Sequence, residues 1–139
     1  EVFQGMRVEQ LIPFVKYQKT GLSTALGLEM KDKLEQLMLE KELYLENDLR
    51  MDDLAKALNL SRNHTSQIIN QYFNRSFFDF VNEYRIEEAK RLLVNRTDKR
   101  TMTQIAYDSG FNNRASFYKA FKKFEGKNPS EYISLKKVS

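Results

Sequence analysis

Residues 105–129 have the sequence IAYDSGFNNRASFYKAFKKFEGKNP, and this stretch decides the fold. A short helical segment with the small residue Ala106 on its inner side leads to Gly110, which permits a sharp turn. Asn113 is a residue type that caps helix N-termini, and the aromatic residues after it recur at helical spacing. The pattern predicts two helices that cross closely through a tight turn, which is a helix-turn-helix unit.

The same pattern occurs once before in the chain. Ala55 recurs as Ala106, a shift of 51 residues, whereas the capping residue Ser61 recurs as Asn113, a shift of 52. One extra residue in the second turn explains the difference. One copy alone would also fit an ordinary helical hairpin, but two copies in register indicate a duplicated helix-turn-helix unit.

The rest of the sequence predicts helices and no strands. Two prolines and five glycines interrupt a chain that is otherwise rich in helix-forming residues. Helices are expected at residues 28–44, 51–58, 62–73 and 77–94, from about 102, at 114–125 and from 129. We therefore predict an all-α fold of about seven helices, in which a long linker helix joins two helix-turn-helix subdomains.

The beginning of the chain does not follow this pattern. Residues 1–5 (EVFQG) match most of a protease recognition site that is used to remove purification tags, so they are left out of the fold. Residues 6–27 are expected to be a leader or linker, and residues 28–139 the domain. Within the domain, the first helix-turn-helix covers about 51–73, the linker helix about 77–94 and the second helix-turn-helix about 102–125.

Composition excludes several classes of function. The 139 residues include no cysteine and one histidine, His64, so no disulfide, cofactor or metal site is expected. The acidic pairs Asp52-Asp53 and Glu87-Glu88 lie on predicted helices, where adjacent side chains diverge, so an enzyme is not expected. The sequence has neither an apolar run long enough to cross a membrane nor a secretion leader, which favours the cytoplasm.

Positive charge is concentrated in the second part of the chain. The net charge is +4, but residues 1–53 have 7 basic and 11 acidic residues, net −4, and residues 54–139 have 16 and 8, net +8. A basic segment suits binding to a polyanion. A solvated helical surface has the same property, so charge supports DNA binding without deciding it.

Residues 105–129 resemble the second helix-turn-helix signature of the AraC family of bacterial transcription regulators. The matching positions are Ile105-Ala106, Gly110-Phe111, Phe117, Phe121-Lys122-Lys123, Gly126 and Pro129. A family-typical segment at residues 84–93 (YRIEEAKRLL) extends the resemblance to roughly residues 34–132. The departures are Thr65, where the family usually has a buried leucine, Ala115, where serine is common, and Asn128, where Ser or Thr is usual.

The resemblance implies a sequence-specific DNA-binding domain of a bacterial transcription regulator. Its long helix would hold both recognition helices on one face, so that they enter successive major-groove segments about one turn, ~34 Å, apart. The implied partner is double-stranded DNA at an operator or promoter, and RNA polymerase is a possible second partner. Such regulators commonly have a sensory or dimerisation domain elsewhere in the protein. Residues 16–21 (KYQKTG) are similar to segments before this domain in membrane-anchored regulators, so both an anchored and an unanchored parent protein stay open.

Candidate base contacts are the residues on the outward, N-terminal side of each recognition helix, where a helix faces the major groove. They are Asn63, Ser66, Gln67 and Asn70 in the first helix, and Arg114, Ala115, Ser116, Tyr118 and Lys119 in the second. Asn and Gln suit adenine, whereas Lys119 and Arg114 suit guanine. Ala115 or Tyr118 suits the methyl group of thymine.

Candidate phosphate contacts are basic residues near the recognition helices and polar residues at the start of the last helix. They are Arg62, Arg75, Lys122, Lys123, Lys127, Asn128 and Ser130. These contacts would set affinity and its salt dependence rather than sequence preference.

Two other interpretations of the same residues remain. The basic half would dock an acidic partner if the chain were a helical protein-interaction module. Exposed aromatic residues would stack on the bases of single strands, although their helical spacing favours the core. The candidates for such stacking are Phe77, Phe78, Phe111, Tyr118 and Phe124.

Overall fold

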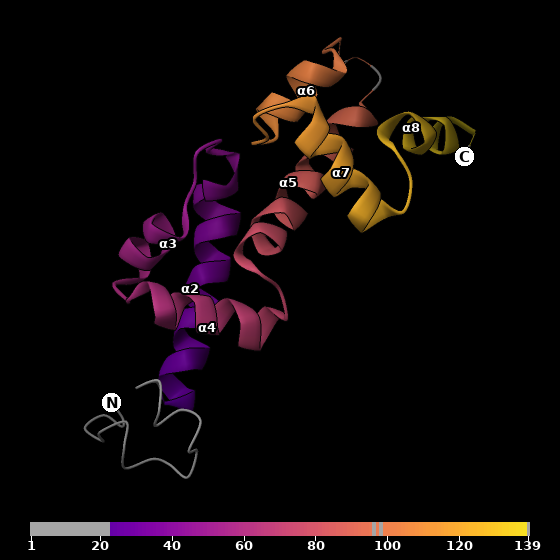
Figure 1. Ribbon diagram of the computed structural model, residues 1–139. Helices are drawn as coiled ribbons and strands as arrows, with labels where there is room; N and C mark the ends of the chain where they lie inside the picture. Colours follow the sequence, from indigo (N-terminus) through magenta and orange to yellow (C-terminus); the bar gives the residue numbers. More distant parts are fainter. Residues whose placement is uncertain (1–22, 96, 98, 139) are drawn as a thin grey trace. The chain divides into compact units, whose positions relative to one another are not determined.

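A computed structural model describes residues 23–95, 97 and 99–138. These residues form seven α-helices and no strand, which confirms the all-α fold (Figure 1). The helices are α2 (Thr24–Lys41), α3 (Met51–Leu58), α4 (Arg62–Phe73), α5 (Phe77–Leu93), α6 (Met102–Asp108), α7 (Arg114–Glu125) and α8 (Pro129–Val138). The chain divides into two compact units, each with one helix-turn-helix. Of the described residues, the first unit contains residues 23–41 and Arg50–Phe77, and the second contains Glu42–Leu49 and those from Phe78 onward.

Helices α4 and α7 begin at the capping residues that the sequence predicts, and side chains also cap α6 and α8. Ser61 and Asn113 each accept a hydrogen bond from the backbone N–H three residues on, at 3.0 and 2.8 Å. Asn128 and Glu131 form a capping box, in which each side chain accepts from the other's backbone N–H at 2.8 Å. Thr101 caps α6. These side chains satisfy backbone donors that have no partner within the helix.

The first helix differs from its predicted bounds of residues 28–44. It is Thr24–Lys41, because Ser23 caps it with a buried side chain whose Oγ accepts the N–H of Leu26 at 3.1 Å. It ends where Glu42 adopts left-handed backbone angles, with φ 50°. Both ends of α2 therefore lie closer to the N-terminus than predicted, because the cap at Ser23 sets its start and the left-handed backbone of Glu42 sets its end. Tyr44, expected at the end of this helix, lies in a short 3₁₀ turn, Leu43–Leu45.

The first unit packs α2, α3 and α4 around one core. Its fully buried side chains include Leu34, Met38, Leu54, Ile68 and Ile69. Helices α2 and α4 approach closely at Gly27, where an added Cβ would lie 2.5 Å from the hydroxyl oxygen of Tyr72. Gly27, which the sequence predicts to lie in the leader, is a packing residue within α2 in the structure.

The core of the second unit is built from α5, α6 and α7. Phe117 and Phe121 are fully buried, and their ring centroids lie 5.7 Å apart in an edge-to-face arrangement. Tyr132 brings α8 onto this core, with its ring centroid 5.5 Å from that of Phe121. Phe111 is 2% exposed, so it belongs to the core rather than to a surface for base stacking.

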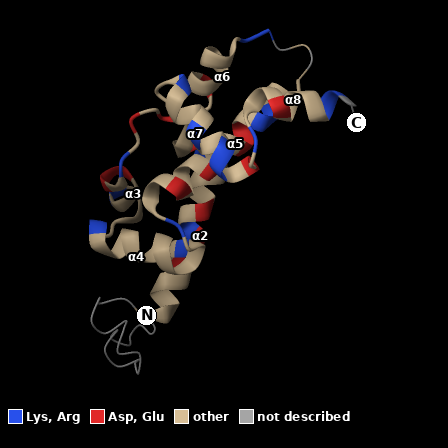
Figure 2. Ribbon diagram, turned by 45° about the vertical axis from the view of Figure 1, so that its right-hand side comes forward, with Lys and Arg blue, Asp and Glu red and all other residues tan. Residues whose placement is uncertain are grey.

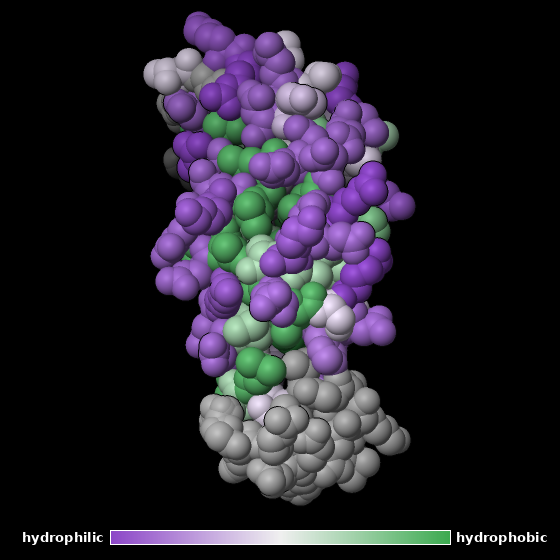
Figure 3. Space-filling model, turned by 90° about the vertical axis from the view of Figure 1, so that its left-hand side faces the viewer, coloured by the Kyte–Doolittle hydropathy of each residue, from purple (hydrophilic) through white to green (hydrophobic). Residues whose placement is uncertain are grey.

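The described surface is mixed in polarity. Figure 3 shows one face, on which hydrophobic residues are visible between hydrophilic ones. The large apolar side chains that stay exposed are Leu28, Leu39, Phe78, Val94, Tyr107 and Leu135. Within residues 23–95, 97 and 99–138, no helix combines the length and the apolar character needed to cross a membrane.

Candidate nucleic-acid interface

A tight turn joins α3 to α4 in the first unit. Asn59 adopts left-handed backbone angles, with φ 58°, and the backbone N–H of Leu60 donates to the carbonyl oxygen of Ala55 at 2.9 Å. Ala55 is 5% exposed, and its small side chain lets the two helices approach each other. The turn leads directly to the cap residue Ser61, so the start of α4 is fixed relative to α3.

The same turn recurs between α6 and α7 in the second unit. The N–H of Phe111 donates to the carbonyl oxygen of Ala106 at 2.9 Å, 51 residues after the matching bond of the first turn. Gly110, with φ 105°, is the left-handed residue here. The next cap residue is shifted by 52, so the extra residue that the sequence comparison requires is Asn112.

The outward side of α4 carries amide side chains. Asn63, Gln67 and Asn70 lie on this side, and we call them the amide surface. Asn63 and Asn70 are exposed, and Gln67 is half-buried. Two long hydrogen bonds run along the helix: Nε2 of Gln67 donates to Oε1 of Gln71 at 3.4 Å, and Nδ2 of Asn70 donates to Oγ of Ser66 at 3.5 Å. Ser66 itself is half-buried, at the edge of the surface.

Thr65 is the buried polar residue of α4. Its side chain is 0% exposed, and Oγ1 donates to the carbonyl oxygen of Ser61 at 2.8 Å. The same carbonyl oxygen accepts the N–H of Thr65 at 3.0 Å. The hydroxyl group is thereby satisfied inside the core, and threonine fits at a position where a leucine is usual.

The outward side of α7 is cationic. Ala115, Lys119 and Lys122 are all exposed there, and we call them the lysine surface. Neither lysine has an ion-pair partner among the residues that the structure describes. Figure 2 shows blue positions on α7, whereas α4 is mostly tan between its ends.

Arg114 and Tyr118 form a pair beside the lysine surface. The guanidinium carbon of Arg114 lies 5.3 Å from the ring centroid of Tyr118, and Nη2 donates to the hydroxyl oxygen at 3.3 Å. The Tyr118 ring is half-buried against Phe117, at a centroid distance of 5.7 Å. The core therefore positions Tyr118, which in turn holds Arg114 at the start of α7. Ser116, two residues after Arg114, is also exposed.

Several candidate phosphate contacts have partners within the protein. Two of them form ion pairs: Arg62 with Asp52 at 3.1 Å, and Lys123 with Asp79 at 2.7 Å. Two others donate hydrogen bonds to backbone carbonyl oxygens: Arg75 to that of Asn74 and Lys127 to that of Glu125, each at 3.2 Å. A phosphate would compete with these partners. Lys122 and Ser130 are exposed, and Asn128 is exposed while it caps α8.

The two turns and their helices match a known family. A family model described as a helix-turn-helix domain matches residues 54–134. This chain belongs to the AraC-type helix-turn-helix family. It is 30% identical over 129 residues to an HTH-type transcriptional regulator of Staphylococcus aureus strain COL. The aligned segment covers 93% of this chain and 17% of that protein. The chain thus spans less than a fifth of the length of such curated relatives.

Solved structures of other regulator domains have the same fold. The C-terminal domain of AraT, a response regulator from Geobacillus stearothermophilus, is 26% identical with a TM-score of 0.67, covering 76% of this chain and 84% of that one. The DNA-binding domain of AdpA, solved in complex with a target DNA, is 18% identical with a TM-score of 0.67, covering 78% and 93%. At 18% identity the likeness to AdpA is one of fold.

The second turn of this AraC-type domain has a further support that the sequence analysis missed. Glu42–Leu49 lies between α2 and α3 in sequence but packs within the second unit, and we call it the strap. Nδ2 of Asn47 donates to the carbonyl oxygens of Tyr107 and Phe111, at 3.1 and 3.0 Å. Asn112 donates in return to the carbonyl oxygen of Asn47 at 3.2 Å. The extra residue of the second turn is therefore one that bonds the strap.

Arg85 holds the strap from α5. Its Nε donates to the carbonyl oxygen of Tyr44 at 2.7 Å, and its Nη2 to that of Glu46 at 2.8 Å. The side chain is 8% exposed, and burial lowers the pKa of its guanidinium group. One signal in the sequence marks this role: Arg85 interrupts the apolar row that Val81 and Ala89 form four residues to either side.

The acidic pairs considered for catalysis have structural roles. Asp53 accepts the backbone N–H of Arg50 at 2.8 Å, at the start of α3. The ion pairs are Asp52–Arg62 at 3.1 Å, Glu87–Lys90 at 3.0 Å and Glu88–Arg91 at 2.7 Å. Family and fold are those of regulator DNA-binding domains, which are not enzymes.

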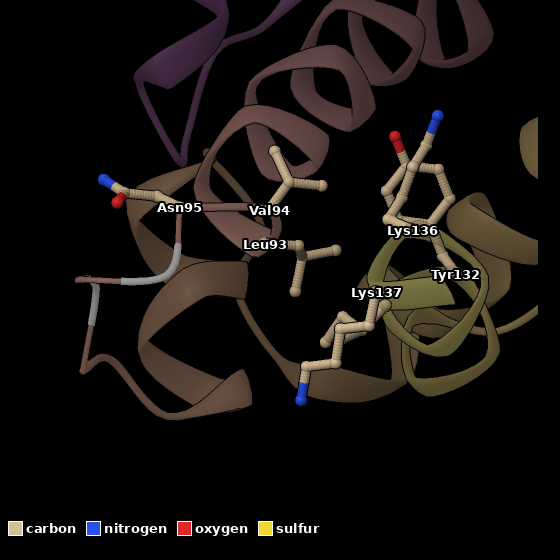
Figure 4. Close-up of a pocket in the computed structure, with 7 residues that line it drawn as sticks. Leu93, Val94, Asn95, Tyr132, Lys136 and Lys137 are labelled. Atoms are coloured by element: carbon tan, nitrogen blue, oxygen red, sulfur yellow. The ribbon is translucent and has the colours of Figure 1, made fainter. Parts of the chain in front are cut away.

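A cavity of about 480 Å³ lies between the end of α5 and α8 (Figure 4). Leu93 and Val94 line it from α5 and the residue after it, and Tyr132, Lys136 and Lys137 line it from α8. The lining contains no carboxylate or imidazole group. Among the described residues, no cluster of His, Cys, Asp and Glu suits a metal ion.

Proposed function

We propose that this domain binds double-stranded DNA sequence-specifically as part of a bacterial transcription regulator. The observation that carries the proposal is the duplicated turn. In each unit the turn is followed by a helix, α4 or α7, whose outward side has exposed residues that can face a major groove. The AdpA domain, which has the same fold, was solved with a target DNA, and the S. aureus relative is named as a transcriptional regulator. Helices α4 and α7 then enter successive major-groove segments about one turn, ~34 Å, apart.

The outward residues of α4 and α7 are the proposed base contacts. They are Asn63, Ser66, Gln67, Asn70, Arg114, Ala115, Ser116, Tyr118 and Lys119. Phosphate contacts are proposed for residues around them, since these hold the helices in the groove. They are Arg62, Arg75, Lys122, Lys123, Lys127, Asn128 and Ser130.

Selection from randomised duplex DNA tests the function and the geometry together. The expected product is a bipartite site whose half-sites lie about one helical turn, ~10 base pairs, apart. Weak, sequence-independent binding at physiological salt would contradict the proposal and favour docking of an acidic protein partner.

Substitution of one residue in each recognition helix gives the first prediction. Gln67→Ala and Lys119→Ala should each relax base preference, at different positions of the selected site, by about 1–3 kcal/mol if the lost contact is bidentate. Binding to a set of single-base variants of the site measures this loss.

Lys33→Ala is the matched control, because Lys33 is an exposed lysine on α2. It should leave every base preference unchanged. Identical preference profiles for all three variants and the wild type would rule out base recognition by Gln67 and Lys119.

We also infer that the whole regulator has a sensory or dimerisation domain outside this chain, and that it acts in the cytoplasm, where bacterial promoters lie. The 17% share of the S. aureus relative supports the first inference.

RNA polymerase is the proposed second partner. Transcription in vitro with purified polymerase, from a promoter that carries the selected site, should rise or fall when the domain is added, and an unchanged rate would contradict a role for polymerase.

A further inference from the structure

The amide surface and the lysine surface occupy equivalent positions in the duplicated unit. With the shift of 52 residues, Asn63 corresponds to Ala115, Gln67 to Lys119 and Asn70 to Lys122. Position by position, the first surface has neutral hydrogen-bonding groups where the second has two ammonium groups and a methyl group. The two units therefore offer different chemistry to DNA through the same geometry.

Charge near the amide surface is low and already engaged. Arg62 is the only Lys or Arg in α4, and its guanidinium pairs with Asp52 at 3.1 Å. In contrast, α7 contains Arg114 and three lysines. Lys123 pairs with Asp79 at 2.7 Å, whereas Lys119 and Lys122 have no ion-pair partner in the described part of the chain. Of these two helices, α7 is therefore the one with lysines that have no ion-pair partner among the described residues.

The exposed amides of Asn63 and Asn70 can meet base edges at low cost, whereas Oε1 of Gln67 is buried without a hydrogen-bond partner and must turn outward to pair with adenine. The bonds from Gln67 to Gln71 and from Asn70 to Ser66 are 3.4 and 3.5 Å long, at the weak end of the hydrogen-bond range. Asn and Gln side chains form bidentate pairs with adenine N6 and N7. Asn63 and Asn70 are seven residues apart, about 10 Å along a helix, which matches about three base-pair steps of ~3.4 Å.

We propose that the two units divide the work of binding: the first recognises a half-site with adenines within about four consecutive base pairs, and the second supplies most of the salt-dependent affinity. This inference rests on the proposed function. Neutral amides displace no condensed counterions, whereas each lysine that neutralises a phosphate adds about 0.9 to the slope of log K against log salt concentration. We therefore expect residues of α7 to account for most of the dependence of affinity on salt concentration, and residues of α4 to account for the preference for adenine.

The test compares register-matched substitutions on the selected duplex. Dissociation constants of the whole 139-residue chain are measured by fluorescence anisotropy between about 50 and 200 mM salt, the range over which phosphate contacts change affinity most visibly. Lys122→Gln should lower the magnitude of the slope by about 0.9, because Lys122 is a proposed phosphate contact. Asn70→Ala should leave the slope unchanged and reduce the preference for one adenine by about 5- to 150-fold.

These substitutions lie at exposed positions, so the fold should persist, and circular dichroism of each variant checks this. Equal slope losses for Asn70→Ala and Lys122→Gln, or a G·C preference in the half-site of α4, would overturn the division while leaving specific DNA binding intact. Absence of any preferred duplex would instead remove the proposed function, and the division with it.

Discussion

Gly110 and Gly126 both have positive φ angles, 105° and 77°, but their surroundings differ. A Cβ at Gly110 would collide with the carbonyl oxygen of Tyr44 and lie 2.6 Å from Nε of Arg85, whereas a Cβ at Gly126 would meet no atom within 4 Å. Gly126→Ala should therefore cost only the left-handed backbone strain, about 1–2 kcal/mol of the free energy of unfolding. Gly110→Ala should cost clearly more, about 3 kcal/mol or above, since the strap must also move. Urea unfolding measures both values, and equal costs would contradict the close contact between strap and turn.

Thr65 allows a second prediction at the residue scale. Because the carbonyl of Ser61 keeps its bond from the Thr65 backbone, Thr65→Val loses only one hydroxyl bond and should change the free energy of unfolding by about 1 kcal/mol or less. Thr65→Leu adds volume to a site with no exposed surface and should destabilise by about 1–3 kcal/mol. A leucine variant as stable as the valine variant would show that the core of the first unit has room for the residue usual in the family.

At the scale of elements, the strap depends on Arg85. Arg85→Met removes the donors to the carbonyl groups of Tyr44 and Glu46, and it should cost about 2–5 kcal/mol of the free energy of unfolding. The matched control is Arg91→Met on the same helix, because Arg91 forms a surface ion pair with Glu88 and its side chain is 66% exposed. Its loss should cost at most about 1 kcal/mol. Similar costs in chemical denaturation would contradict the role of Arg85 in holding the strap.

The helices themselves were largely predictable, and the strap was not. Caps such as Ser61 and Asn113 act over three residues, so their effect is visible in the local sequence. The start of α2 was missed because Ser23 was placed in the expected leader. Arg85 and Asn47 bond backbone carbonyls that are about 40 or 60 residues away. Carbonyl groups have no sequence signature, so local patterns could not identify these partners.

At the scale of the whole molecule, the two recognition helices of the proposed function are separated by few residues outside α5 and α6, and we expect this to limit how far apart the half-sites can lie. Three residues, 74–76, join α4 to α5, and Leu49 of the strap is followed directly by Arg50 of the first unit. Three residues reach about 10 Å when extended, whereas five added base pairs lengthen DNA by about 17 Å. Inserting five base pairs between the half-sites should therefore reduce affinity to about that of a single half-site.

The matched control for this experiment is the same insertion placed outside the selected site, which should have no effect. Gel-shift titration of both duplexes gives the comparison. Full affinity for the split site would mean that the units bind independently of each other.

The sequence by itself determined the all-α fold, the duplication, the two turns and the exposed positions of Asn63, Asn70, Lys119 and Lys122. Helical periodicity and capping are local, so a residue such as Lys119 can be placed on its face from its neighbours alone. Only the tertiary structure decided that the strap packs in the second unit, that Asn112 bonds it, and that Lys123 is paired with Asp79 whereas Lys122 is not. The physical reason is that these partners lie far apart in the chain and meet only when the helices pack.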